Sequence, residues 1–97
     1  MRSDLSPGEK AAQLVHAAGE SARLAPSLPP DTAAVAIVAK DEAELLSLEE
    51  RLQRGGILFS SIREQEGRRA GQLLAIGCAP APRATMKVFL SSYPLLR

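Results

Sequence analysis

A chain of 97 residues with a formal charge of +1 and one cysteine fits a single small domain. No apolar run reaches the about 18 residues that a membrane span needs, and a lone cysteine cannot form an internal disulfide. We therefore expect one domain over residues 1–97, located in the cytoplasm, with no membrane partner and with Cys78 as a small core residue.

The low net charge hides an uneven distribution along the chain. Residues 1–50 carry four basic and nine acidic side chains, whereas residues 51–97 carry eight basic and two acidic ones. A basic segment suits a phosphate backbone, because lysine and arginine displace its counterions. Nucleic acid is therefore a candidate partner, although halves of a sequence need not be halves of a molecule.

The first predicted helix covers residues 7–24. Ser6 is a good N-cap, Pro7 suits the first helical position, and Glu9 stands three residues after Ser6, which completes a capping box. Three prolines within residues 26–30 end the helix. Its larger apolar residues and two alanines share one side: Leu14, Val15, Ala18 and Ala22.

The middle of the chain predicts two strands with a helix between them. Residues 33–39 form a continuous apolar run, which is typical of a strand covered on both faces. Asp41 and Glu44 form a second capping box, and the helix they open runs to about Arg54. Its buried stripe consists of Leu45, Leu48 and Leu52. Residues 57–62 predict the next strand.

The last part of the chain predicts a strand and a helix. A polar loop over residues 64–71 precedes a strand at 72–77, and residues 83 to about 92 form a helix. Its inward side chains are Met86, Val88, Phe89 and Leu90. The whole order predicts an α/β fold, with a small mixed β-sheet of three to four strands and helices on both faces. Glycine-rich phosphate motifs and Cys/His metal spacings are absent from the sequence, so we expect no cofactor and no metal site.

The start of the chain resembles a known family. The segments Asp4-Leu5, Ser6-x-Gly8 and Ala11-Ala12-Gln13-x-x-His16-Ala17 are similar to the opening of the archaeal and eukaryotic type of peptidyl-tRNA hydrolase. Residues 41–46 and 74–80 resemble later segments of that family, and its divergent bacterial branch fits best. The resemblance implies an ester hydrolase that separates a peptide from tRNA. The family fold has one strand more at its front, so we expect either a homodimer through strand pairing or a compensating use of residues 1–5.

The chain departs from the family pattern at three positions. Glu9 stands where the family has a lysine, and Lys10 is one residue further on. In the family's loop an Asp and a Thr are replaced by Gln65 and Arg69. We therefore expect any hydrolase activity to be lower than that of typical relatives.

The resemblance and the residue chemistry imply two sets of site residues. The candidate catalytic residues are Lys10, Gln13, Glu64 and Glu66, and the candidate RNA-binding residues are Arg63, Arg68, Arg69, Arg83 and Lys87. The alternative is a catalytically impaired module on the same fold that binds tRNA, another RNA or a protein. On that interpretation Gln13 and His16 share a helix face for structural reasons, and the charged loop is a solvated turn.

Overall fold

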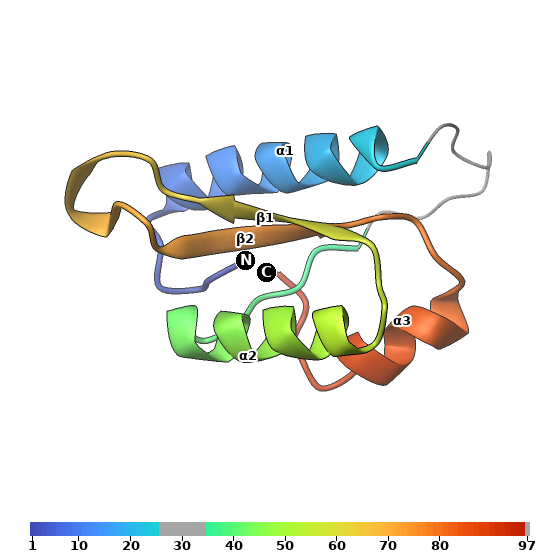
Figure 1. Cartoon of the computed structure of the whole chain (residues 1–97). Coiled ribbons are helices and arrows are strands. Elements are labelled where there is room, and N and C mark those ends of the chain that lie inside the picture. The colour runs from blue at the N-terminus through green and yellow to red at the C-terminus, as the bar shows by residue number, and fades with distance from the viewer. Residues whose placement is uncertain (26–34, 97) are drawn as a thin grey trace.

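The computed structural model describes residues 1–25 and 35–96. This part contains the helices α1 (Pro7–Arg23), α2 (Glu42–Arg54) and α3 (Arg83–Leu90), the short 3-10 helix η1 (Gly67–Arg69), and the antiparallel strands β1 (Phe59–Arg63) and β2 (Leu73–Cys78). α1 covers one face of the sheet and α2 the other (Figure 1). The expected α/β class with helices on both faces is confirmed. No helix in this part is long and apolar enough to cross a membrane.

The first two helices begin where their capping residues predict. At α1 the Ser6 hydroxyl accepts a hydrogen bond from the Glu9 N–H, and the Glu9 carboxylate accepts one from the Ser6 N–H. At α2 the Asp41 carboxylate accepts from the Glu44 N–H at 3.0 Å. The Glu44 carboxylate, however, accepts from the N–H of Lys40, one residue earlier than a capping box requires. The first capping box is confirmed, and the second is half formed.

α2 packs on the sheet through the leucine stripe that its sequence predicts. Leu45, Leu48 and Leu52 are buried and form one cluster with Ala39 and Leu73. Half-buried side chains surround this cluster: Ile57, Phe59, Ile76, Cys78, Phe89, Leu90 and Tyr93. Burial raises the pKa of the Cys78 thiol, as expected of a cysteine that serves as a core residue.

α1 contacts the sheet through small residues rather than through its larger apolar ones. Gly77 of β2 lies so close to α1 that a Cβ at this position would overlap the carbonyl oxygen of Ala17. The Ser21 hydroxyl donates to a backbone carbonyl of β2. Leu14 and Val15 are instead 40% and 70% exposed. The side that carries Leu14 and Val15 is therefore not the side that faces the sheet, because only small residues fit this close approach.

The first residues of the chain join β2 to residues 37–39. The Arg2 N–H donates to the Leu74 carbonyl at 3.3 Å on one side. On the other side the Ser3 N–H donates to the Ala39 carbonyl, and the Ala39 N–H donates to the Met1 carbonyl, each at 2.7 Å. Residues 1–3 thus lie between β2 and residues 37–39, which is the compensating use expected of the N-terminal segment.

The expected strand over residues 33–39 is not confirmed. In its described part, Ala39 makes one isolated bridge to Arg2, and Ile37 makes one to Leu95. Residues 33 and 34 lie outside the described residues. The pairing between Ala39 and the N-terminal segment is limited to one bridge, because the chain turns directly after Arg2. The sheet of the described residues therefore has two regular strands, extended by single bridges, rather than three to four.

α3 is shorter than predicted and presents fewer side chains to the core. It ends at Leu90 rather than near residue 92. Phe89 and Leu90 pack against the core, but Val88 is 72% exposed, so its predicted inward position is wrong. Met86, Phe89 and Leu90 have the three- and four-residue spacing of one helix face, and Val88 falls on another. β1 and β2 begin within two residues of their predicted starts.

Candidate functional site

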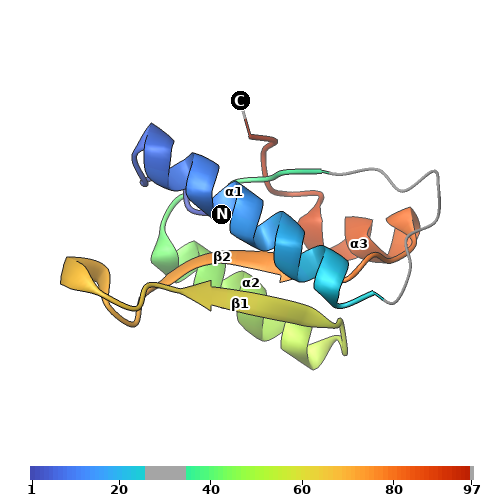
Figure 2. The ribbon, with the colours of Figure 1, turned by 90° about the horizontal axis from the view of Figure 1, so that it is seen from above.

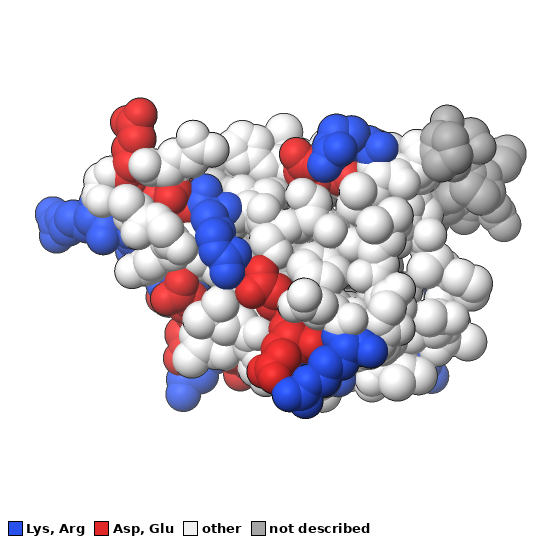
Figure 3. Space-filling model, in the orientation of Figure 1, with Lys and Arg blue, Asp and Glu red and all other residues white. Residues whose placement is uncertain are grey.

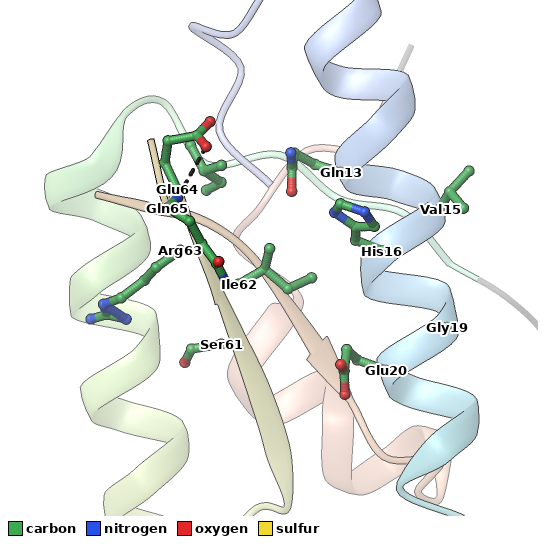
Figure 4. A pocket seen from close by; sticks show the side chains of 11 residues that line it. Gln13, Val15, His16, Gly19, Glu20, Ser61, Ile62, Arg63, Glu64 and Gln65 are labelled. Atoms are coloured by element: carbon green, nitrogen blue, oxygen red, sulfur yellow. Dashed lines mark hydrogen bonds between the residues drawn. The ribbon is translucent and has the colours of Figure 1, made fainter. Parts of the chain in front are cut away.

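A cleft of about 540 Å³ opens between α1 and the end of β1. One wall comes from α1, the other from β1 and the residues that follow it, and β2 adds a single side chain; the lining residues are Gln13, Val15, His16, Gly19, Glu20, residues 61–65 and Leu74. Figure 4 shows Gln13 and His16 extending from α1 toward the opposite wall. The cleft thus contains two of the four candidate catalytic residues, Gln13 and Glu64.

Gln13 is the buried residue of α1. It is 8% exposed, and its Oε1 has no hydrogen-bond partner among the described residues. An unpartnered buried polar group costs about 1–3 kcal/mol. His16 and Glu20 follow three and seven residues later, so helical spacing brings them to the same wall. The sequence spacing could have identified Glu20 together with Gln13 and His16. A buried amide that borders a cleft is suited to bind a polar group of a ligand.

Glu64 stands where β1 ends and the loop to β2 begins. Its N–H donates to the Gln72 carbonyl at 3.0 Å, and its carbonyl accepts from the Gly71 N–H at 2.8 Å. Its side-chain Oε1 accepts from the N–H of Gln65 at 3.0 Å and from that of Glu66 at 3.4 Å, and the former bond is drawn in Figure 4. One oxygen of this candidate base therefore orders the turn beside the cleft.

Arg63 is held by a carboxylate of α2. Both of its terminal nitrogens lie 3.2 Å from the Glu49 carboxylate oxygens, and the Ser61 hydroxyl donates to the same carboxylate. The predicted RNA-binding role of Arg63 thus competes with an ion pair inside the protein. No sequence signal pointed to Glu49, because it belongs to another helix and stands 14 residues before Arg63.

Two candidate catalytic residues do not reach the cleft. Lys10 borders a different, apolar surface next to Leu14 and Leu96. Glu66 is exposed in the loop and is not among the residues that line the cleft. Lys10 and Gln13 are three residues apart, which separates them by about 60° around a helix. Of the two, only Gln13 lines the cleft.

Glu9 and Arg69 contact each other across the start of α1 and the loop. The Arg69 Nη1 lies 3.7 Å from the Glu9 Oε2 and is buried without a hydrogen-bond partner among the described residues. The hydrogen bond from the Ser6 N–H, together with that from its hydroxyl, lowers the pKa of the Glu9 carboxyl. Two of the three departures from the family pattern are therefore partners of one another, and they join α1 to η1.

The candidate RNA-binding residues do not form one surface. Arg68 and Arg69 lie in η1, at the end of the molecule where β1 leads into β2, whereas Arg83 and Lys87 lie on α3 at the opposite end (Figures 1 and 2). On the face drawn in Figure 3, basic and acidic side chains lie side by side rather than in patches of one sign. The basic half of the sequence is therefore not a basic half of the molecule.

No group of three or more His, Cys, Asp or Glu side chains within residues 1–25 and 35–96 is placed to hold a metal ion. A scan against protein-family models and a search of curated proteins each found no match to this chain. The assignment of function therefore depends on the chemistry of the cleft and on the resemblance of the first helix.

Proposed function

We propose that this chain is a peptidyl-tRNA hydrolase-like protein of the cytoplasm that binds the ester end of peptidyl-tRNA in the cleft. The observation that carries the proposal is the buried Gln13 amide, with its unpartnered oxygen, in the same cleft as Glu64. The resemblance of the α1 sequence to this hydrolase family supports the same assignment. Both observations concern Gln13, which belongs to the family-like motif and is also the buried residue of α1.

The reaction needs a base for water and a donor for the oxyanion. In the proposed reaction, Glu64 accepts a proton from a water molecule, and this water attacks the ester carbonyl. The Gln13 Oε1, which has no partner among the described residues, accepts a hydrogen bond from this water, and the NH₂ group of the same amide donates to the oxyanion. The bond from the carbonyl carbon to the ribose oxygen then breaks, and Glu64 returns its proton to that oxygen, so that tRNA leaves with a free hydroxyl. The new carboxylic acid loses its remaining proton to solvent, and the peptide leaves as a carboxylate.

Slow turnover is part of the proposal. One Glu64 oxygen already accepts from the loop N–H groups, and Arg63 is neutralised by Glu49. Lys10 borders another surface, so no lysine stabilises the oxyanion in the cleft. The loss of a single oxyanion donor commonly costs about 10²- to 10³-fold in rate. We expect measurable but weak ester cleavage.

A second candidate function is binding without turnover. The Glu64 carboxylate accepts a hydrogen bond from its own loop, and Arg63 pairs with Glu49. Both contacts favour binding without turnover, because they leave fewer side chains of the cleft free to react. On this alternative the chain holds tRNA or another partner through the same fold.

Release of a labelled N-acetyl-peptide from peptidyl-tRNA tests the proposal. We expect wild-type protein to release the peptide above the spontaneous rate, and Glu64→Gln to lower that rate by about 10²-fold or more. Glu66→Gln and Lys10→Ala are matched controls outside the cleft and should change it less than twofold. Absence of release at excess wild-type protein, with retained tRNA binding, would establish the second candidate instead.

A further inference from the structure

β1 has an open edge that borders the cleft. Among the described residues it pairs with β2 on one side only. The Leu58 carbonyl accepts from the Ala79 N–H, and Glu64 bonds Gln72 and Gly71, so residues 58 and 64 direct their backbone groups toward β2. Backbone groups alternate along an antiparallel strand. The N–H and C=O groups of Ser61 and Arg63 therefore face the open edge.

α1 forms the wall opposite this edge. Its residues line the cleft in the reverse order to those of β1: Gln13 is level with Glu64, and Glu20 is level with Ser61 (Figure 4). Gly19 leaves space on this wall, because a Cβ there would meet nothing within 4 Å. A groove between an open strand edge and a helix has the form that accepts an extended peptide as an added strand.

The charges of the groove favour a peptide over a nucleic-acid backbone. Arg63 is the one lysine or arginine among the residues found to line it, and Arg63 is paired with Glu49. Glu20 and Glu64 are the other charged lining residues. Glu20 is likewise paired, with Arg23. The described lining residues therefore offer no free cation to a phosphate, whereas the neutral backbone of a peptide can bond the open edge without an electrostatic cost.

We propose that the acyl peptide of the substrate binds along the open edge of β1 as an additional parallel strand. This inference rests on the proposed function, which places the ester carbonyl between Gln13 and Glu64. The peptide then leads away from Glu64 toward Ser61, and its direction from N- to C-terminus is that of β1. Hydrogen bonds to Ser61 and Arg63 recognise the main chain, so binding is largely independent of the peptide sequence.

The geometry sets a length for this subsite. From Ser61 to Glu64 the strand advances by three residues, or about 10 Å. We therefore expect the KM for N-acetyl-peptidyl-tRNA to fall by about threefold with each added residue whose main chain faces β1, that is with every second residue, up to a length of three. Longer peptides should show no further gain, and kcat should change less than KM.

An N-methyl scan of a non-hydrolysable ligand tests strand docking on the wild-type protein. The probe is N-acetyl-trialanyl-3′-amino-3′-deoxyadenosine, in which an amide replaces the ester, and its Kd is measured by calorimetry. Every second peptide N–H faces β1, so N-methylation should weaken binding by about tenfold at alternate positions and by less than twofold between them. A flat or uniform scan, or no binding of the probe, overturns the inference.

A protein variant tests the same contact from the other side. Ser61→Pro removes an N–H that faces the open edge, which an edge strand tolerates, and Ser61→Ala controls for the lost hydroxyl bond to Glu49. We expect Ser61→Pro to weaken probe binding by about fivefold and Ser61→Ala to leave it within twofold. Equal affinities in the two variants overturn the inference; if Ser61→Pro does not fold, the scan on wild-type protein decides alone.

The failure of this inference is distinguishable from that of the proposed function. Ester cleavage with a flat scan rejects strand docking and leaves the hydrolase. An alternating scan without ester cleavage rejects the hydrolase and leaves a peptide-binding groove.

Discussion

Two buried polar residues of this protein differ in whether their side-chain polar atoms have hydrogen-bond partners. Arg2 is 6% exposed and donates to Asp4, to the Gln72 side chain at 2.7 Å and to the Leu73 carbonyl at 3.4 Å. Gln13 is about equally buried, but its Oε1 finds no hydrogen-bond partner in residues 1–25 and 35–96. Buried polar groups normally form hydrogen bonds within the protein. Arg2 fits this rule and has a structural role, whereas the burial of Gln13 is better explained by binding to a ligand.

Gln13→Leu separates stability from function. Removing a buried amide without a partner should raise the free energy of unfolding by about 1 kcal/mol, while the rate of peptide release should fall at least tenfold. Chemical denaturation and the release assay measure the two effects. Gln53→Leu, at an exposed position of α2 outside the cleft, is the matched control. A marked loss of stability in Gln13→Leu would show that the amide has a structural partner after all.

The contact of Asp4 with Arg2 predicts a pH dependence of stability. The hydrogen bond from Arg2 lowers the pKa of the Asp4 carboxyl below its ordinary value. This carboxylate therefore stabilises the fold above its unfolded pKa of about 3.9, and the contribution is lost as the pH falls through the lower, folded value. Asp4→Asn should cost about 1 kcal/mol at pH 7 and less at acidic pH.

Urea unfolding of wild type and Asp4→Asn at a series of pH values measures this effect. Glu66→Gln removes an exposed loop carboxylate and serves as the control. A constant difference between wild type and Asp4→Asn from pH 2 to pH 7 would contradict the assignment.

At the residue scale, the sequence predicted part of the site. Gln13 and Glu64 line the same cleft. The sequence could indicate this, because helical spacing and the end of a strand can both be recognised in it. Lys10 and Glu66 were grouped with them because each is next to a position of the family motif and could supply its charge, but neither lines the cleft. The ion pairs with Glu49 and between Glu9 and Arg69 join different elements, and no local pattern encodes such contacts.

At the scale of elements, the approach of α1 to β2 positions the wall of the cleft. The contact depends on Gly77, where a Cβ would overlap the Ala17 carbonyl. The length and start of α1 were predictable from its cap and from the proline segment that follows. The residue it packs against was not, because no pattern within one helix can reveal that a glycine on a distant strand lies against Ala17.

Gly77→Ala should push α1 away from the sheet. We expect a loss of about 2 kcal/mol or more in the free energy of unfolding, as for other overpacked contacts. Gly19→Ala is the matched control within α1, because a Cβ there meets nothing within 4 Å. It should stabilise the protein by about 0.5–1 kcal/mol through helix propensity. Denaturant unfolding measures the change in the free energy of unfolding of each variant. Equal changes in the two variants would contradict the close contact between Gly77 and Ala17.

At the scale of the whole molecule, the sheet is completed by segments distant in sequence. Residues 1–3 lie between β2 and residues 37–39, and Leu95 pairs with Ile37 on the far side. The sequence predicted the α/β class and the leucine core, which depend on local periodicity. It did not predict where strand pairing stops, because that depends on how far separate segments run side by side before the chain turns.

The distribution of charge over the whole molecule predicts which end contacts tRNA. Residues 64 and 65 of the cleft lead into the loop that holds η1 and Arg68, whereas α3, which carries Lys87, lies at the opposite end of the molecule from this loop (Figures 1 and 2). The ester end of a bound tRNA must reach the cleft, so its phosphates pass Arg68 rather than Lys87.

Arg68→Ala should therefore weaken tRNA binding about threefold at 50 mM salt and reduce the slope of log K against log salt by about one. Lys87→Ala, which removes one exposed charge from α3, should change neither quantity. Salt titrations of labelled tRNA measure both, and equal effects of the two variants would mean that tRNA is attracted by net charge without a defined path to the cleft.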